Sequence, residues 1–305
     1  MTVSDASSHV ARPNFFIIGA MKSGTTSLHS YLHGHPDIFM CHPKEPSYFV
    51  DRSQLKVIWP EMEKRGYWKS EEAYLALFED AGPVPVIGES STNYTKLNFV
   101  TGVPERLASF APDAKLLYIM RDPVERTISH YWHNVQLHGE SRPLSRAVKE
   151  DAHYMEVSYY AMQLKAFLKV FPQEQIKTLV FEEFKKDPTG TLKDIYTWLG
   201  VRDDFTPDNL EKKYNESPSS MKQATAGGIL YSIRYSRLWS AMGPLIPPKL
   251  RSFARKLSER EVRRHDVNND EVIDFLRPIQ QQQVAELEEL LNRDFKAWST
   301  LYGTR

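Results

Sequence analysis

A short loop between an apolar run and a helical segment constrains this chain more than any other feature. Phe15–Gly19 (FFIIG) has the pattern of a buried strand, and Thr25–His33 that of a helix with Leu28 and Leu32 one turn apart. The loop between them, GAMKSGTT, brings free backbone N–H groups and the positive end of a helix dipole to one point. We therefore predict that this strand, loop and helix bind a phosphate or a similar anion.

The loop departs from the standard nucleotide phosphate loop, because Thr25 stands where that motif has its lysine. The lysine of this loop is Lys22, whose flexible side chain can still reach a bridging or leaving oxygen. A glycine and serine turn that only caps a helix is the alternative interpretation. The candidate anion-binding residues are Lys22, Ser23, Gly24, Thr25, Thr26 and Ser27.

Short apolar runs alternate with helical patterns along the chain as far as Leu199. This alternation is typical of a parallel sheet flanked by helices. We predict an α/β fold: a flexible tail over residues 1–13, then one domain over 14–305 with a central, mainly parallel sheet. A long helix is expected to end between Glu286 and Trp298. The further runs are Val84–Gly88, Lys115–Met120 and Ile176–Phe181, and the helical segments are Pro104–Phe110, Val124–Val135, Ser158–Phe171 and Leu192–Leu199.

A second polar cluster follows the run Lys115–Met120. Arg121 stands at the end of this expected strand, and Ser129 lies about two turns into the next helix. Both can face the sheet edge at which α/β proteins bind their ligands, so a second phosphate is expected there. The alternative is that Arg121 or Arg126 simply pairs with a neighbouring acid such as Glu125.

Composition limits the partners. The chain has 39 Lys plus Arg and 39 Asp plus Glu, so it lacks the basic excess of a protein that grips nucleic acid. Cys41 is the single cysteine, which excludes an internal disulfide and fits a reducing, cytoplasmic location. The sequence contains no run of about twenty apolar residues, so no membrane span is predicted. The stretch 239–256 allows a peripheral membrane contact, although a capping helix is the plainer interpretation.

Several polar residues are interpreted without a ligand. The histidines of His29–His35 (HSYLHGH) are expected in a loop or on a helix surface, and glutamines 280–283 on a solvated helix face. The acids and histidines form no compact ligand set, so no metal is expected.

Two segments carry a resemblance to a known family. FFIIGAMKSGTTSL and LLYIMRDPVERTISHYW resemble the 5′-phosphosulfate and 3′-phosphate motifs of sulfotransferases that use 3′-phosphoadenosine 5′-phosphosulfate (PAPS), in the right order. The chain looks most like the heparan sulfate sulfotransferase branch and its bacterial relatives. Other segments extend the resemblance over nearly the whole chain: KEPSYF, GESSTNY, SYYAMQL, LVFEEFKKDP and LEELLNRDFKAW.

The resemblance implies a role for each candidate residue. Glu45 takes the place of the catalytic base, and Lys22 that of the cation beside the leaving 5′-phosphate and the sulfuryl group. His133 corresponds to an auxiliary catalytic histidine. The resemblance also assigns Arg121 and Ser129 to the 3′-phosphate and Tyr160 to the nucleotide frame.

The chemistry agrees with a carboxylate base, since the acceptor hydroxyl must lose its proton as sulfur is attacked. Burial near aromatic residues is expected to raise the pKa of Glu45. The alternative for Glu45 is a plain ion pair with Lys44.

Two positions depart from the family pattern. Ser90 follows Glu89 where related heparan enzymes often have a lysine, and the loop 215–222 lacks the usual Lys-Gly pair. Ser217 or Lys222 is the candidate replacement that closes over the nucleotide.

We therefore expect a PAPS-dependent sulfotransferase acting on a hydroxyl or amine of a carbohydrate or other small-molecule or lipid acceptor. A nucleotide kinase or NTPase and a non-catalytic nucleotide-binding protein are the alternatives. The acceptor and the oligomeric state cannot be read from the sequence.

Overall fold

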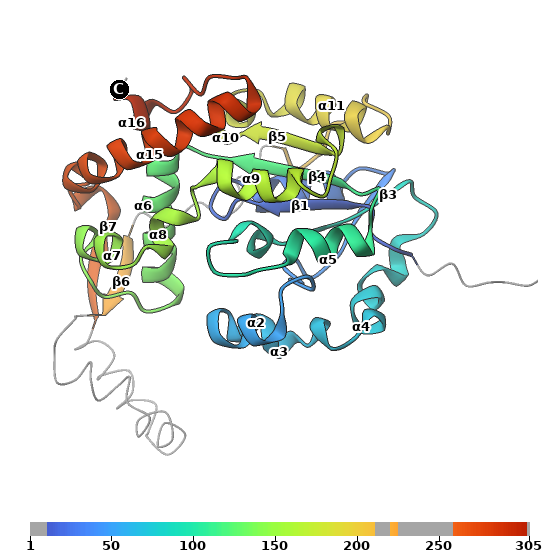
Figure 1. The fold of residues 1–305 in the computed structure, drawn as a ribbon, viewed down its shortest axis with the longest axis horizontal. Coiled ribbons are helices and arrows are strands. Elements are labelled where there is room, and N and C mark those ends of the chain that lie inside the picture. The colour runs from blue at the N-terminus through green and yellow to red at the C-terminus, as the bar shows by residue number, and fades with distance from the viewer. Residues whose placement is uncertain (1–10, 211–219, 225–258, 304–305) are drawn as a thin grey trace, which may run out of the picture.

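A computed structural model describes residues 11–210, 220–224 and 259–303 (Figure 1). Five strands form one sheet in the order β2-β3-β1-β4-β5, and every neighbouring pair is parallel. The expected α/β architecture with a parallel sheet is therefore confirmed. The strands are β1 (Phe15–Gly19), β2 (Ile38–Met40), β3 (Val86–Ser90), β4 (Lys115–Met120) and β5 (Ile176–Val180).

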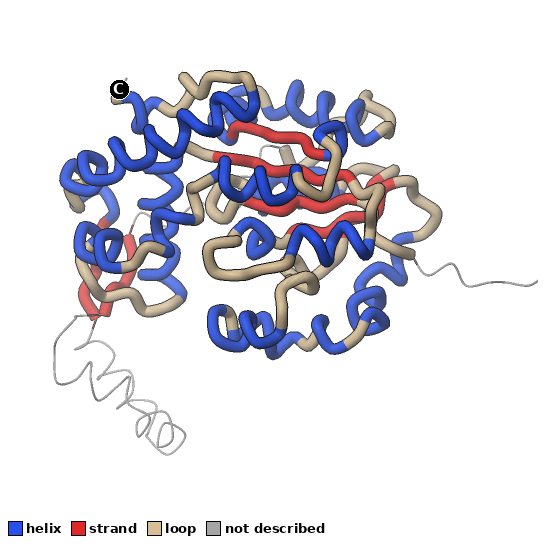
Figure 2. Tube along the Cα trace, in the orientation of Figure 1, coloured by secondary structure: helices blue, strands red, loops and turns tan. Residues whose placement is uncertain are grey.

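Helices cover both faces of this sheet (Figure 2). Alternate residues of β1 enter opposite core layers: Phe16 belongs to the cluster formed with α5, α6, α9 and α15, and Ile17 to the cluster formed with α1, α10 and α11. The α-helices are α1 (Thr25–His33), α2 (Arg52–Ile58), α3 (Pro60–Arg65), α4 (Glu71–Leu75), α5 (Val103–Phe110), α6 (Pro123–Leu137), α7 (Leu144–Glu150), α8 (His153–Glu156), α9 (Tyr160–Leu168), α10 (Phe181–Lys186), α11 (Pro188–Leu199), α15 (Asp270–Leu291) and α16 (Ser299–Tyr302). The 3-10 helices are η1 (Tyr67–Lys69), η2 (Ala76–Ala81), η3 (Thr92–Thr95), η4 (Gln173–Gln175) and η6 (Arg264–Asp266).

Every strand and helix that the sequence predicts among the described residues is present, with bounds that differ by a few residues, but several shorter elements were not predicted: β2, α2, α3, α4, α7, α8, α10 and α16. β2 was not predicted, because a run of three residues carries almost no periodicity. β3 begins and ends two residues later than its predicted run, because Gly88 pairs with Phe15 and Ser90 with Ile17 inside the sheet.

The strand order brings separate segments to one edge. β1 and β4 are neighbours, so the loops that leave their carboxyl ends lie side by side. β3 flanks β1 on its other side and β2 flanks β3, which brings the loops after these two strands to the same edge. Four segments therefore lie at one edge: residues 19–24 after β1 (the phosphate loop), the Arg121 segment after β4, the loop with Glu45 after β2 (the Glu45 loop) and η3 after β3.

The C-terminal part of the chain supports this edge. Asp122 caps α6 by accepting from the Val124 and Glu125 N–H groups, and its second oxygen accepts from the Thr300 and Leu301 N–H groups. A two-stranded ribbon of β6 (Ser220–Ala224) and β7 (Glu259–Arg263) packs β6 against α6 (Figure 1). The end of the chain thus fixes the helix that carries Ser129 and His133.

Three polar residues differ from their expected exposure. His29 is buried, and its Nδ1 shares a 2.8 Å hydrogen bond with the Ser90 hydroxyl. His35 is also buried, with Nε2 2.9 Å from the Arg202 carbonyl and Nδ1 accepting from the Asp37 N–H. Gln280 is fully buried as well, and its Nε2 donates to the Met155 carbonyl (3.3 Å) instead of facing water.

Parts of three predictions lie outside the described residues: residues 1–10 of the tail, Ser217, and the stretch 239–256. Arg12 already contacts the domain, since it donates to Glu71 and stacks on Phe110. No helix among residues 11–210, 220–224 and 259–303 has the length and apolar content to cross a membrane.

Candidate active site

The phosphate loop has the backbone that an anion site requires. Lys22 and Gly24 have positive φ angles of 68° and 87°, which curl the chain between β1 and α1. No side chain caps the first turn of α1, so its N–H groups remain available. The Ser23 hydroxyl is fully buried without a hydrogen-bond partner in the described structure. A bound anion would satisfy these donors.

Gly24 is required by its surroundings as well as its φ angle. A Cβ atom there would lie 2.7 Å from the ring of Phe181, which follows β5. Thr25 is buried, and Thr26 and Ser27 are half-buried on the first turn of α1.

Cations converge on the loop from distant parts of the chain. Arg121 Nη1 donates to the Lys22 carbonyl (3.3 Å), and Arg121 Nη2 lies 3.5 Å from Glu125. Burial and the positive charges of Arg121 and Arg264 lower the pKa of Lys22 to about 8. Arg264, which was not predicted as a site residue, belongs to η6, directly after the β6–β7 ribbon. This excess of positive charge favours an anionic ligand.

Arg121 and Arg126, the two arginines of the second motif (LLYIMRDPVERTISHYW), have different surroundings. Arg126 is fully buried and donates to the Ser158 hydroxyl and the Tyr154 carbonyl, so it is part of the core. Arg121 is the one that reaches the phosphate loop, and the pairing with Glu125, the alternative interpretation, is one of its contacts.

α6 and α9 complete the second motif. Ser129 is buried on α6, and His133 lies one turn further on, half-buried. Burial and the charge of Lys22 lower the pKa of His133 to about 4, which makes it a neutral imidazole at pH 7. Tyr160 is buried behind Arg121, and its hydroxyl donates to the Arg121 carbonyl (2.7 Å). The structure therefore places Tyr160 in support of the Arg121 backbone.

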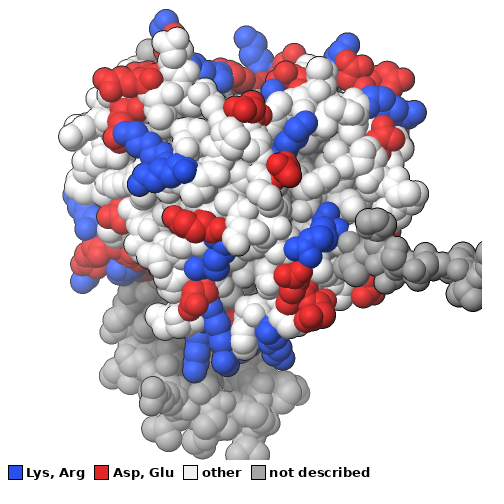
Figure 3. Space-filling model, turned by 45° about the vertical axis from the view of Figure 1, so that its right-hand side comes forward, with Lys and Arg blue, Asp and Glu red and all other residues white. Residues whose placement is uncertain are grey.

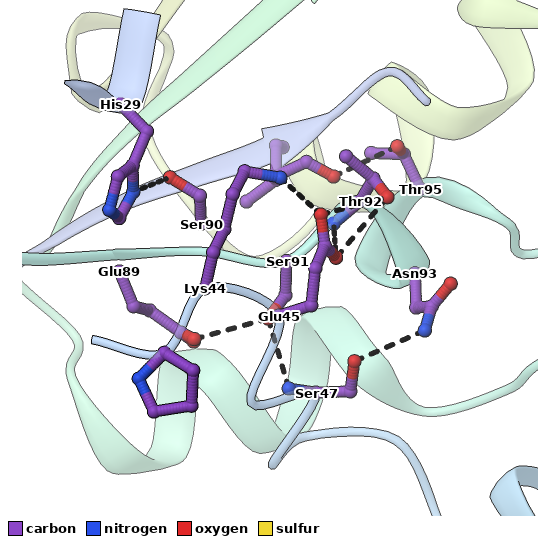
Figure 4. Close-up of polar contacts among 12 residues, drawn as sticks. His29, Lys44, Glu45, Ser47, Glu89, Ser90, Ser91, Thr92, Asn93 and Thr95 are labelled. Atoms are coloured by element: carbon purple, nitrogen blue, oxygen red, sulfur yellow. Dashed lines mark hydrogen bonds and ion pairs between the residues drawn. The ribbon is translucent and has the colours of Figure 1, made fainter. Parts of the chain in front are cut away.

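Glu45 sits in a tightly held loop after β2. Its φ is 65°, and its N–H donates to the Ser90 carbonyl (2.9 Å) at the end of β3. Its carboxylate accepts from the Thr92 N–H (2.7 Å) and the Thr92 hydroxyl (3.3 Å), and Lys44 Nζ forms an ion pair with it (Figure 4). The pair with Lys44, the alternative interpretation of Glu45, is thus present.

The expected pKa shift of Glu45 is wrong in sign. Burial does act to raise the pKa, but the charge and hydrogen bond of Lys44 and the Thr92 N–H outweigh it and leave the pKa below its ordinary value. The partners of Glu45 are set by the fold, because Thr92 lies 47 residues away in the sequence.

A second carboxyl, Glu89, lies beneath the Glu45 loop and was missed as a site residue. It is fully buried, and it accepts from the hydroxyls of Tyr94 (2.6 Å), Tyr74 (3.2 Å) and Ser91 (3.1 Å). Burial raises its pKa to about 7 despite these donors. The Ser91 hydroxyl also accepts from the Ser47 N–H (3.0 Å), which ties Glu89 to the Glu45 loop (Figure 4). The sequence signal that could have identified Glu89 is an acidic residue at the end of the apolar run that forms β3.

Of the two residues predicted to close over the nucleotide, only Lys222 lies among the described residues. Ser217 is outside the described residues, and Lys222 lies in β6 opposite Glu261 of β7. Among the described residues, no group of three or more His, Cys, Asp or Glu side chains is placed to hold a metal ion.

Comparison with known proteins agrees with this site. Residues 13–206, which include both phosphate motifs and Glu45, match the sulfotransferase family. The chain belongs to that family. The crystal structure of a sulfotransferase from Alicyclobacillus acidocaldarius is 30% identical, with a TM-score of 0.67 over 94% of this chain and 99% of that one.

Two relatives extend the comparison to eukaryotes. Mouse heparan sulfate glucosamine 3-O-sulfotransferase 3B1 is 27% identical over 226 residues, which are 71% of this chain and 53% of that protein. The membrane-associated sulfotransferase kil1 of Dictyostelium discoideum is 28% identical over 93% of this chain and 66% of its own length. This chain spans about half the length of the mouse relative. The predicted family and branch are confirmed, and a kinase is not favoured.

Proposed function

We propose that this sulfotransferase family member transfers a sulfuryl group from PAPS to a hydroxyl or amine of an acceptor. The observation that carries the proposal is the meeting of an anion-binding loop and an ionised carboxylate at one sheet edge. Lys44 and Glu45, which form an ion pair, follow β2, and the phosphate loop follows β1, so the parallel order β2-β3-β1 brings the base and the phosphate loop to the same edge.

The residues fit the donor. The uncapped first turn of α1 and the unpartnered Ser23 hydroxyl supply donors for the 5′-phosphosulfate, and Lys22 adds positive charge. Arg121 and Ser129, on the neighbouring segment, supply the site for the 3′-phosphate. PAPS itself brings a sulfuryl group on a phosphate leaving group, and no metal ligand set is needed to bind it.

Each residue then has a defined task in an in-line transfer. Glu45 accepts the acceptor proton as the acceptor oxygen or nitrogen attacks sulfur. Lys22 stabilises the charge that develops on the leaving 5′-phosphate oxygen. His133, neutral at pH 7, can accept or donate a hydrogen bond beside Lys22 but carries no charge there.

The acceptor we propose is a carbohydrate or another small molecule bearing hydroxyl or amine groups. The names of the mouse and Dictyostelium relatives support the same reaction class, and the mouse relative is named for a glucosamine acceptor. Basic and acidic side chains are interspersed on the face drawn in Figure 3, in keeping with the neutral total charge. A cytoplasmic location is our proposal as well, supported by the single, buried Cys41.

The test is sulfuryl transfer from radiolabelled PAPS to a panel of glycans, phenols and lipids, with products identified by mass spectrometry. Lys22→Ala and Glu45→Gln are each expected to reduce turnover at least about 100-fold. Glu174→Gln is the matched control, because Glu174 is exposed and lies in η4, before the start of β5. This variant is expected to keep full activity. Robust turnover by Lys22→Ala would refute the role given to Lys22, and robust turnover by Glu45→Gln would refute the role given to Glu45.

Calorimetry separates the remaining alternatives. Tight binding of 3′-phosphoadenosine 5′-phosphate (PAP) without transfer to any acceptor would support a non-catalytic binding protein. Hydrolysis of ATP with Mg²⁺ at a rate above PAPS turnover would instead favour the kinase or NTPase alternative.

A further inference from the structure

Protein groups hold the Glu45 carboxylate on two sides. Thr92 holds it from one side through its N–H and hydroxyl, and the Lys44 ammonium holds it from the other (Figure 4). Both ends of the ion pair are mostly shielded, with 18% of the Lys44 side chain and 19% of the Glu45 side chain exposed. A partly buried ion pair of this kind is little screened by solvent.

This arrangement opposes the reaction that Glu45 is proposed to carry out. A general base must gain a proton during the transfer, and an adjacent ammonium favours the ionised form instead. Thr92 cannot leave, because its main-chain N–H is fixed in η3 after β3. Lys44 can leave, because its charge sits on a flexible four-carbon stem.

The structure also indicates where the Lys44 ammonium can go. Lys44 follows β2 and Lys22 follows β1, and because the order β2-β3-β1 is parallel throughout, both loops leave the same edge of the sheet. In an in-line transfer the sulfur atom lies between the leaving oxygen, beside Lys22, and the attacking oxygen, whose proton faces Glu45. The sulfonate oxygens of the donor therefore come within the range of an ammonium group that already contacts Glu45.

We propose that Lys44 is a catalytic residue that exchanges the Glu45 carboxylate for the sulfonate oxygens of the bound donor, so that donor binding frees the base. This inference rests on the proposed function. In the transfer, the acceptor O–H proton goes to Glu45, the new oxygen–sulfur bond forms, and the sulfur–oxygen bond to the 5′-phosphate breaks with its electron pair on the phosphate. Lys44 keeps its proton throughout and stabilises the sulfonate charge.

The loop does not need the Lys44 side chain to keep its shape. Arg65 Nη1 donates to the Lys44 carbonyl (2.8 Å) and the Glu45 carbonyl (3.1 Å), and the Glu45 N–H is bonded to Ser90. Lys44→Met, which retains the length of the stem, is therefore expected to fold. Lys44→Arg restores the charge and serves as the second variant.

The experiment measures the protonation of Glu45 directly. Infrared difference spectra of wild type against Glu45→Gln isolate the carboxylic acid band, which is titrated in free protein, with PAP, and with PAPS without acceptor. PAP lacks the sulfonate, so PAPS is expected to raise the proton affinity of Glu45 about tenfold above its value with PAP. In Lys44→Met, Glu45 is expected to have the higher proton affinity already in the free protein, and PAPS is expected to raise it no further than PAP does. In Lys44→Arg, the difference between PAPS and PAP is expected to remain.

Kinetics supply the second readout. Lys44→Met is expected to lower kcat about 100-fold with little change in acceptor KM, while Lys64→Met, on the exposed surface of α3, is unchanged. Equal Glu45 titrations with PAP and PAPS, together with PAPS binding and turnover, would overturn the role of Lys44 alone. Failure of PAPS and PAP to bind at all would overturn the proposed function itself.

Discussion

Replacing Glu89 by glutamine is expected to change how the stability of this protein depends on pH. Glu89 has no exposed surface and three hydroxyl donors, and its pKa is raised to about 7 by burial. Glutamine mimics the protonated acid, because one carbonyl oxygen can accept from Tyr94 and the amide can donate towards Ser91. Below pH 4.5 the two proteins should therefore be about equally stable.

The magnitude follows from the shift. Between the ordinary pKa of 4.5 and about 7, the unfolded chain ionises Glu89 while the folded protein keeps it protonated. Wild-type stability therefore falls as pH rises through this window, by about 3 kcal/mol in total from one carboxyl. Glu89→Gln lacks this loss, so above pH 7 it should be the more stable protein by an amount of that order.

Urea unfolding at half-unit steps from pH 4.5 to 8 measures the effect. Glu182, whose pKa is also raised to about 7 by burial, is present in both proteins and cancels in the difference. Glu174→Gln, at the surface, should follow wild type. A difference between wild type and Glu89→Gln that stays constant with pH would refute the protonated state assigned to Glu89.

Three further predictions follow from packing and charge. Gly24→Ala is expected to destabilise the fold by about 1–3 kcal/mol and to abolish PAP binding, since φ is 87° and the new Cβ would meet Phe181 at 2.7 Å; thermal unfolding with and without PAP measures both. Arg264→Gln is expected to weaken PAP binding about tenfold by calorimetry, with Arg264→Lys recovering part of it; unchanged affinity would remove Arg264 from the site. Asp122→Ala removes the acceptor of four N–H groups and should cost about 2–4 kcal/mol in urea unfolding, whereas a loss below about 0.5 kcal/mol would contradict its anchoring of α16.

The accuracy of the sequence predictions varied with the range of the interactions involved. The phosphate loop was predictable because a strand, a glycine turn and a helix start are encoded within neighbouring residues. β2 was not, because its three residues acquire strand geometry only by pairing with β3. His29 and His35 were assigned to the surface because their partners, Ser90 and the Arg202 carbonyl, are far away in the sequence.

The sequence alone determined the α/β class and the strand, loop and helix that carry Lys22, since each depends on a local pattern of residue types. The roles of Glu45 and Lys22 were predicted from the family resemblance and remain predictions. Only the tertiary structure decided how those residues are charged. The pKa of Glu45 lies below its ordinary value because the Lys44 charge and the Thr92 N–H outweigh burial. The pKa of Glu89 lies above its ordinary value because burial outweighs its three hydroxyl donors and the Glu45 charge adds to the rise. Electrostatic energy depends on distances between side chains, and the fold sets those distances.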